Sequence, residues 1–202
     1  MILSVCPNPS VDCTIELDTL KTGSLNRVEN KVITYSGKAL NVAVGVARLG
    51  GDSFATGFMF DDNGKMFVHA LDDEGVKNTF VWNKGGARTN YKIVDKRSMM
   101  TEINDKGEPV DEKQQEELLD LVGTLSQQAS VVVMSGSLPS GVSDDYYLKL
   151  SERIPKNVKK IFDVTGDRLV NALKGGAYLV KPNLDELKEV TGEHYDGYDE
   201  ML

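Results

Sequence analysis

The sequence is poor in cysteine. It has two cysteines in 202 residues, Cys6 and Cys13, and no histidine or second cysteine pair lies near them at metal-ligand spacing. A disulfide scaffold or a structural zinc site needs more ligands at tighter spacings. We therefore expect both cysteines to be buried and to act as small hydrophobic residues.

Basic residues and long apolar runs are scarce too. The chain has 23 Lys and Arg against 31 Asp and Glu, a net charge of −8, and no basic cluster, which argues against a nucleic-acid partner. No apolar run approaches the roughly 18 residues of a membrane span. The first six residues have no basic segment or cleavage site typical of a signal peptide. These absences predict a cytoplasmic protein without a membrane partner.

What is present is an alternation of apolar runs of strand length with amphipathic stretches of helix length. This pattern predicts βαβ units and an α/β fold with a mostly parallel sheet. The expected strands cover residues 2–5, 53–60, 130–134, 159–163 and 177–180. The expected helices cover residues 40–49, 63–71, 111–125, 143–150 and 183–190.

Two segments depart from this alternation of strands and helices. Residues 13–35 and 90–103 alternate apolar and polar side chains, which indicates paired strands outside the main sheet. Together they predict a small β appendage made from two insertions that are far apart in the sequence. No Pro-rich linker or repeat appears, so we do not divide the chain into sequential domains.

Ligands of an open α/β sheet bind beyond the carboxyl ends of its strands, so the residues there deserve inspection. After the first strand, residues 8–12 (Asn-Pro-Ser-Val-Asp) place the Asp12 carboxylate where it can accept a hydrogen bond from a substrate hydroxyl; an Asx turn is the alternative. Further on, Gly37 and Lys38 open a helix, where free N–H groups favour an anion; an ordinary helix cap is the alternative. This segment is not a P-loop, because Val32 and Ala39 stand where that motif needs Gly and Ser or Thr.

Two more segments carry candidate groups. The glycines at 85 and 86 lead to Arg88, whose planar guanidinium suits phosphate, although an isolated arginine is usually solvated or paired at the surface. Asn183 with Glu186 three residues later is a capping box in the broad sense, and Pro182 keeps Lys181 extended before it.

Taken together, these segments resemble the PfkB (ribokinase-like) family of carbohydrate kinases, and most closely its sugar-phosphate branch of 1-phosphofructokinase and tagatose-6-phosphate kinase. The matching segments follow the family's order and cover the chain almost end to end. They are residues 8–12, 37–43, 88–90, 101–104 (Thr-Glu-Ile-Asn), 135–139 (Ser-Gly-Ser-Leu-Pro) and 181–186. The resemblance implies a ribokinase-like fold, a doubly wound, mostly parallel sheet with a small β lid.

The resemblance also implies roles for particular residues. Asp12, Gly37 and Asn41 would hold sugar hydroxyls, and Arg88 with Lys38 would bind the phosphate of the substrate. Asn183 and Glu186 match an Asn-x-x-Glu motif that helps to place Mg²⁺ and the nucleotide phosphates, with Glu186 near the metal through water. An asparagine can cap a helix and still lie near the water molecules that surround Mg²⁺. Residues 135–139 would form the turn beneath the substrate, and no chemistry is assigned to them.

The chain departs from the family pattern in two places. Ala39 stands where the family usually has glycine, so its methyl could crowd the ligand. The family's Gly-Ala-Gly-Asp segment, which supplies the anion hole and the general base, does not occur in these residues. We therefore expect the chain to correspond to the N-terminal two-thirds of such a kinase, with the base beyond Leu202.

The implied reaction transfers the γ-phosphoryl group of ATP, with Mg²⁺, to a ketose phosphate, first of all fructose 1-phosphate. Tagatose 6-phosphate is the alternative substrate, and a nucleoside kinase fits less well because its substrates lack a phosphate for Lys38 and Arg88. The alternative of another class is a non-catalytic sugar-phosphate-binding or assembly module. A homodimer formed through the β lid is the expected partner arrangement.

Overall fold

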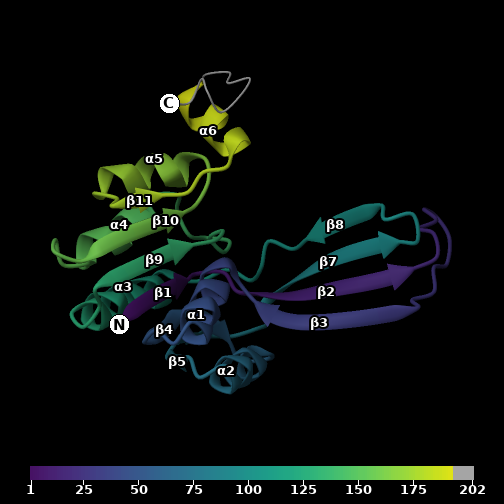
Figure 1. Cartoon of the computed structure of the whole chain (residues 1–202), viewed down its shortest axis with the longest axis horizontal. Coiled ribbons are helices and arrows are strands. Elements are labelled where there is room, and N and C mark those ends of the chain that lie inside the picture. Colours follow the sequence, from purple (N-terminus) through teal and green to yellow (C-terminus); the bar gives the residue numbers. More distant parts are fainter. Residues whose placement is uncertain (193–202) are drawn as a thin grey trace.

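A computed structural model describes residues 1–192 of the chain. It consists of an α/β body and a β sheet that projects from one side of it (Figure 1). We call this projecting sheet the lid. The mostly parallel α/β architecture predicted from the sequence is confirmed.

The sheet of the body has seven strands in the order β11-β10-β9-β1-β4-β5, with β6 also paired to β4. All of its strand pairs are parallel. Its strands are β1 (Ile2–Cys6), β4 (Ser53–Phe60), β5 (Lys77–Asn78), β6 (Val81–Asn83), β9 (Val131–Ser135), β10 (Lys159–Asp163) and β11 (Leu179–Val180). Because the strands are parallel, their carboxyl ends meet at one edge, which faces the base of the lid.

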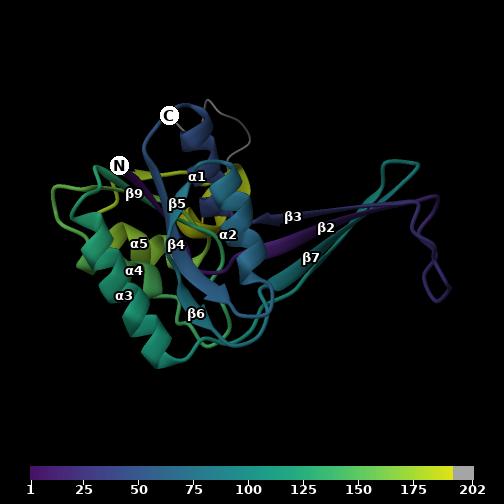
Figure 2. The same ribbon diagram turned by 90° about the horizontal axis from the view of Figure 1, so that it is seen from below.

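Helices cover both faces of this sheet. Helices α1 (Lys38–Arg48) and α2 (Gly64–Asp73) lie on one side, and α3 (Glu112–Ser126), α4 (Tyr146–Arg153) and α5 (Asp167–Lys174) lie on the other (Figure 2). Helix α6 (Leu184–Thr191) follows β11 and contacts α5. The core between these layers is built from fully buried apolar side chains such as Leu3, Phe58 and Phe162. It buries apolar side chains from each of the helices α1 to α5.

The lid has four strands in the order β3-β2-β7-β8, and they are β2 (Ser10–Leu17), β3 (Asn30–Ser36), β7 (Arg88–Asp95) and β8 (Met100–Asn104). The pairing of β2 with β7 joins the two insertions, as the alternating sequence pattern predicts. Thr34, Asp12, Asn90 and Asn104 form one row across the four strands. Ile33, Cys13, Tyr91 and Ile103 form the next row, which points to the opposite face because side chains alternate along strands.

Several predicted boundaries need correction. Helix α4 begins at Tyr146 rather than at residue 143, because residues 143–146 form a turn closed by the bond from the Tyr146 N–H to the Ser143 carbonyl. Strand β11 is limited to Leu179 and Val180, since only these pair with β10. Helix α5 was not predicted. Its exposed Val170 and Leu173 obscure the helical spacing of buried Leu169 and Ala172.

Both cysteines are free and buried, as expected, with Cys6 at 1% and Cys13 at 5% exposure. Within residues 1–192, no helix combines the length and the apolar character needed to cross a membrane.

Candidate active site

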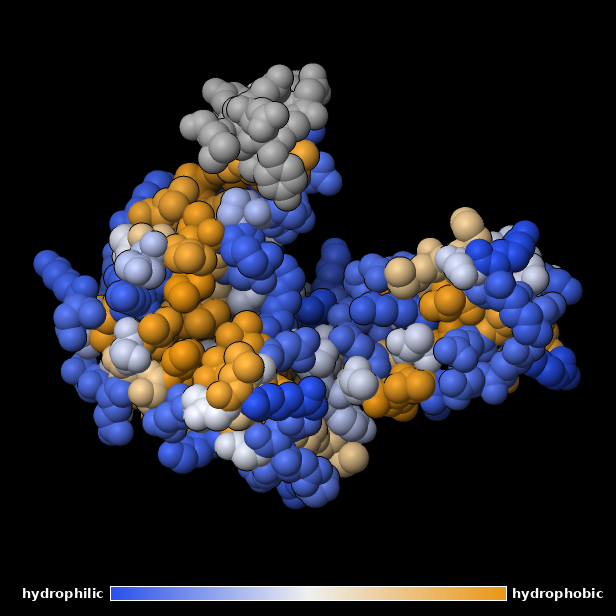
Figure 3. All heavy atoms as spheres, viewed as in Figure 1, coloured by the Kyte–Doolittle hydropathy of each residue, from blue (hydrophilic) through white to orange (hydrophobic). Residues whose placement is uncertain are grey.

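A cleft of about 390 Å³ lies between the carboxyl edge of the body sheet and the base of the lid. Figure 3 shows the hollow between the two parts, bordered mainly by hydrophilic residues. All five residues expected to bind the substrate line it, namely Asp12, Gly37, Lys38, Asn41 and Arg88. They come from β2, the start of α1 and the start of β7, so residues distant in sequence converge on one site.

Asp12 is the centre of a hydrogen-bond network on the cleft face of the lid. Its Oδ1 atom accepts bonds from the Ser10 hydroxyl (3.0 Å) and from Nδ2 of Asn90 (3.1 Å). Its Oδ2 atom accepts a 2.6 Å bond from the Ser36 hydroxyl. A carboxylate offers about four acceptor sites, so three donors orient the group and leave one site on Oδ2 for a ligand.

Gly37 lies where the chain passes from β3 into α1. A Cβ at this position would meet Sγ of Cys6 at 2.6 Å, so only glycine leaves the local packing undisturbed. Burial raises the pKa of the Cys6 thiol to about 11, and the thiol therefore stays neutral beneath the cleft. The methyl of Ala39 is buried in the core and does not line the cleft, so it does not crowd a ligand.

Arg88 begins β7 at the junction of lid and body. Its Nη1 donates to the Asp105 carbonyl at 3.3 Å and to Oδ1 of Asn90 at 3.5 Å. Both distances lie beyond the usual 2.7–3.2 Å range for such bonds. The guanidinium therefore makes only weak hydrogen bonds to the protein and can bind an anion in the cleft.

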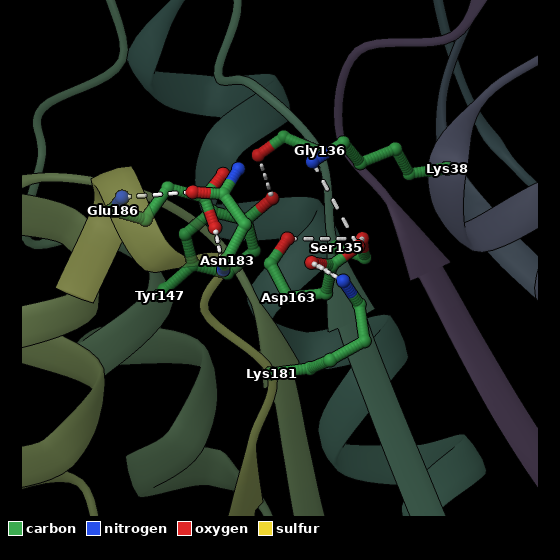
Figure 4. A network of polar contacts seen from close by, with 8 residues as sticks. All are labelled: Lys38, Ser135, Gly136, Tyr147, Asp163, Lys181, Asn183 and Glu186. Carbon is green, nitrogen blue, oxygen red and sulfur yellow. Dashed lines mark hydrogen bonds and ion pairs between the residues drawn. The ribbon is translucent and has the colours of Figure 1, made fainter. Parts of the chain in front are cut away.

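A second charged group lies beside the cleft, around Asp163 at the end of β10 (Figure 4). Its carboxylate lies 3.8 Å from Nζ of Lys38 and 3.3 Å from Nζ of Lys181, and it accepts a 3.0 Å bond from the Ser135 hydroxyl. Asp163 thus gathers cationic side chains from α1 and from the segment before α6. Sequence reasoning did not single out this aspartate.

Asn183 and Glu186 form the predicted capping box at the start of α6. Oδ1 of Asn183 accepts from the Glu186 N–H, and Oε2 of Glu186 accepts from the Asn183 N–H, both at 2.8 Å. Neither residue lines the cleft, although Figure 4 places them near the Asp163 group. The capping bond engages one of the two carboxylate oxygens of Glu186, Oε2.

These residues fit a water-mediated contact with Mg²⁺. Within residues 1–192, no group of three or more His, Cys, Asp or Glu side chains is placed to hold a metal ion by itself. Mg²⁺ instead keeps several waters and usually takes one or two carboxylates together with substrate phosphates. The second carboxylate oxygen of Glu186, Oε1, which the capping box does not use, meets that limited requirement.

Sequence reasoning assigned no individual chemical role to several residues that line the cleft. On the lid side these are Ser10, Ser36, Asn90, Lys92, Glu102 and Asn104, and on the body side Ser137, Thr165 and Arg168. Alternation along β7 and β8 could have placed Asn90, Lys92 and Glu102 on the face of Asp12 once the strand register was known. Arg168 belongs to the unpredicted helix α5.

The sequence profile described as "pfkB family carbohydrate kinase" matches residues 8–201. The chain belongs to the pfkB family of carbohydrate kinases. Among curated relatives, this pfkB chain is 33% identical over 202 residues to the 1-phosphofructokinase of Borreliella burgdorferi. The alignment covers all of this chain and 65% of that relative.

Solved structures agree with the family assignment. Phosphofructokinase-2 from Escherichia coli in complex with fructose-6-phosphate superposes with a TM-score of 0.89 at 27% identity, covering 99% of this chain and 67% of that one. A tetrameric inhibited form of the same enzyme has a TM-score of 0.89 at 26% identity, with 99% and 66% coverage. The pfkB chain therefore has the fold of these kinases over about two-thirds of their length.

Proposed function

We propose that this pfkB chain binds a monophosphorylated ketose between body and lid, as the sugar-binding part of an ATP-dependent sugar-phosphate kinase. The observation that carries the proposal is that Asp12, Asn41 and Arg88 line one cleft, since a hydroxyl acceptor, an amide and a guanidinium suit the two ends of such a sugar. Two relatives support the substrate class, because one is named 1-phosphofructokinase and the other is in complex with fructose-6-phosphate.

The sugar would bind through Asp12, Gly37 and Asn41. The free acceptor site on Asp12 Oδ2 takes a hydroxyl, and the glycine lets the substrate approach the backbone. Because Ser10, Ser36 and Asn90 already hold the carboxylate in place, little side-chain entropy is lost when the sugar binds. Preorganisation of this kind improves both affinity and orientation.

The phosphate of the substrate would bind to Arg88, with Lys38 as a second cation. The protein as a whole carries a charge of −8 and repels a dianion at long range. A local cationic site is therefore needed, and the guanidinium offers two parallel N–H bonds to phosphate oxygens. We propose fructose 1-phosphate as the substrate and tagatose 6-phosphate as the alternative.

The phosphoryl donor would be ATP, bound beside Asn183 and Glu186. Mg²⁺ supplies neutralisation of the phosphate charge during transfer. The 202 residues contain no Gly-Ala-Gly-Asp segment, which in the family supplies the anion hole and general base. Loss of preorganised donors alone costs on the order of 10²–10³ in rate, so we expect no appreciable turnover from these residues alone.

Calorimetric titration of the purified chain with fructose 1-phosphate, tagatose 6-phosphate and fructose tests the proposal. We expect the two phosphorylated sugars to bind and fructose to bind much more weakly. Arg153→Ala is a matched control, because this arginine pairs with Glu116 and Asp120 at the α3–α4 surface, away from the cleft. Equal binding of fructose and the two phosphorylated sugars would contradict a site that recognises phosphate.

A second role, homodimer assembly through the lid, is favoured by the lid face opposite Asp12. Ile33, Tyr91 and Ile103 are 44%, 40% and 56% exposed there, in one row across the sheet. Apolar side chains gathered on one face usually mark an interaction surface. Light scattering coupled to gel filtration should show a dimer that Ile103→Lys dissociates. A monomeric wild type would contradict this role.

A further inference from the structure

Two buried polar atoms in the cleft lack a hydrogen-bond partner. Among residues 1–192, the buried side-chain atoms without a partner are Oγ of Ser4, Oδ1 of Asn8, Oγ1 of Thr56 and Nε of Arg88. Asn8 and Arg88 both line the cleft, and one atom is an acceptor while the other is a donor. An unpaired buried polar group destabilises the folded protein, so the joint occurrence of two in one site calls for a physical reason.

The two unpaired groups border the same glycine. A Cβ at Gly107 would lie 3.0 Å from Oδ1 of Asn8, and 3.4 Å and 3.7 Å from Cβ and Cδ of Arg88. The glycine has φ +87°, a conformation that side chains disfavour. The absence of a side chain at residue 107 thus leaves room between the asparagine oxygen and the arginine.

Two hydrogen bonds hold the amide nitrogen of Asn8, and its amide oxygen has no partner. It is 4% exposed, and its Nδ2 donates to the Lys106 carbonyl at 3.3 Å and to the Ser137 hydroxyl at 3.1 Å. With the amide nitrogen bound to two acceptors, Oδ1 can only receive a donor. The nearby donor without a partner is Nε–H of Arg88.

We propose that Asn8 is the positioning residue of Arg88 and that Oδ1 accepts the Nε–H bond when a sugar phosphate is bound. The inference rests on the proposed function, in which Arg88 binds that phosphate. The bonds of Nη1 to Asp105 and Asn90 are long and are given up to the phosphate oxygens. The guanidinium then presents its Nη N–H groups to the phosphate. The bond from Nε–H to Oδ1 of Asn8 holds the orientation of the guanidinium plane.

A double-mutant cycle tests this coupling, with affinities for fructose 1-phosphate and fructose measured by calorimetry. A hydrogen bond to a charged group contributes strongly to binding, so Asn8→Ala should weaken fructose 1-phosphate binding about tenfold. Fructose binding should change little. In an Arg88→Lys background, which keeps the charge but has no Nε–H, Asn8→Ala should have almost no further effect. An equal loss in both backgrounds would overturn the proposal.

Asn26→Ala is the control outside the cleft. The Asn26 side chain also donates to backbone carbonyls, those of Lys21 and Ser24, in the loop between β2 and β3. Asn26→Ala should leave fructose 1-phosphate binding at its wild-type value. A loss as large as that of Asn8→Ala would show that the effect is not specific to Asn8, and would overturn the proposal.

A spectroscopic readout needs no Asn8 variant. The Nε–H signal of Arg88, assigned by its loss in Arg88→Lys, should shift downfield and exchange more slowly with solvent when fructose 1-phosphate is added. An Nε–H signal that does not respond to bound sugar phosphate overturns the role of Asn8 while leaving the proposed function intact. If the wild type binds no sugar phosphate by calorimetry, both fail.

Discussion

Sγ of Cys6 lies 2.6 Å from the point that a Cβ on Gly37 would occupy. The thiol is buried in the core, so Gly37→Ala must shift Cys6 or displace the segment that leads into α1. We expect a loss of about 1–3 kcal/mol in stability, as for other overpacked cores, together with weaker binding of fructose 1-phosphate. Chemical denaturation and calorimetry measure the two effects.

The double variant Cys6→Ala/Gly37→Ala is the control for that substitution. Removing Sγ removes the nearest contact, so much of the lost affinity should return. If the double variant binds no better than Gly37→Ala alone, the glycine serves a direct approach of the ligand rather than packing against Cys6.

The reactivity of Cys6 gives a second prediction. Burial raises the pKa of its thiol from an ordinary value of 9.0 to about 11. Only the thiolate reacts, so Cys6 should resist a disulfide reagent such as DTNB at pH 8 in the native state and react after denaturation. Because the folded pKa lies above the unfolded one, the stabilising effect of the neutral thiol is complete below pH 9 and declines as the pH rises towards 11.

Comparison with Cys6→Ala separates this contribution from that of lysines and tyrosines, which titrate in the same range. If the wild type and Cys6→Ala lose stability in parallel between pH 9 and 11, the thiol makes no contribution to the pH dependence.

Part of this arrangement was predictable, because it depends on local sequence patterns and on a general rule for α/β sheets. Strand β4 and strand β10 were predicted with correct bounds, because an apolar run between turn residues is a local signal. The convergence of Asp12, Gly37 and Arg88 on one cleft followed from the rule that ligands bind beyond the carboxyl ends of parallel strands. The family resemblance supplied their individual roles.

Other features depend on contacts between distant segments, and the sequence did not reveal them. The pairing of β2 with β7 decides that Asn90 bonds to Asp12, and no local pattern fixes that register. The pair of unpartnered atoms on Asn8 and Arg88 depends on the path of Gly107 between them. The ion pairs of Asp163 depend on α1 and on the segment before α6 meeting at the end of β10.

The turn at the far end of the lid gives a third prediction. Asp95 accepts bonds from the N–H groups of Arg97 (2.9 Å) and Met99 (3.0 Å) and from the Arg97 guanidinium (3.1 and 3.2 Å). Burial by itself raises the pKa of Asp95, but the bonds from Met99 and Arg97 outweigh it, so the pKa lies below its ordinary 3.8. The turn is thus stabilised by the carboxylate above about pH 4 and loses that support as the pH falls further.

Asp95→Ala removes both carboxylate oxygens. It should loosen the turn at neutral pH, seen as faster amide hydrogen exchange at Arg97 and Met99, with the body unaffected. Arg97→Ala removes the guanidinium alone and should have a smaller effect, because the backbone bonds to Oδ1 remain. Unchanged exchange in Asp95→Ala would show that the hairpin itself holds the turn.

Asp12 and Arg88 line the same cleft but should differ in what they recognise. Asp12→Ala removes a hydroxyl acceptor and leaves Ser10, Ser36 and Asn90 without their partner, so it should weaken fructose and fructose 1-phosphate alike, by about tenfold or more. Arg88→Ala should weaken the phosphorylated sugar by a similar factor and leave fructose nearly unchanged.

The ratio of the two affinities is the decisive quantity, because a general loss of folding lowers both and cancels in the ratio. Ser10→Ala is a useful control, since it removes one donor to Asp12 but keeps the carboxylate, and it should leave the ratio at its wild-type value. If Asp12→Ala changes the ratio as strongly as Arg88→Ala does, the carboxylate lies near the phosphate rather than the hydroxyls. The sugar would then lie in the cleft in the opposite orientation.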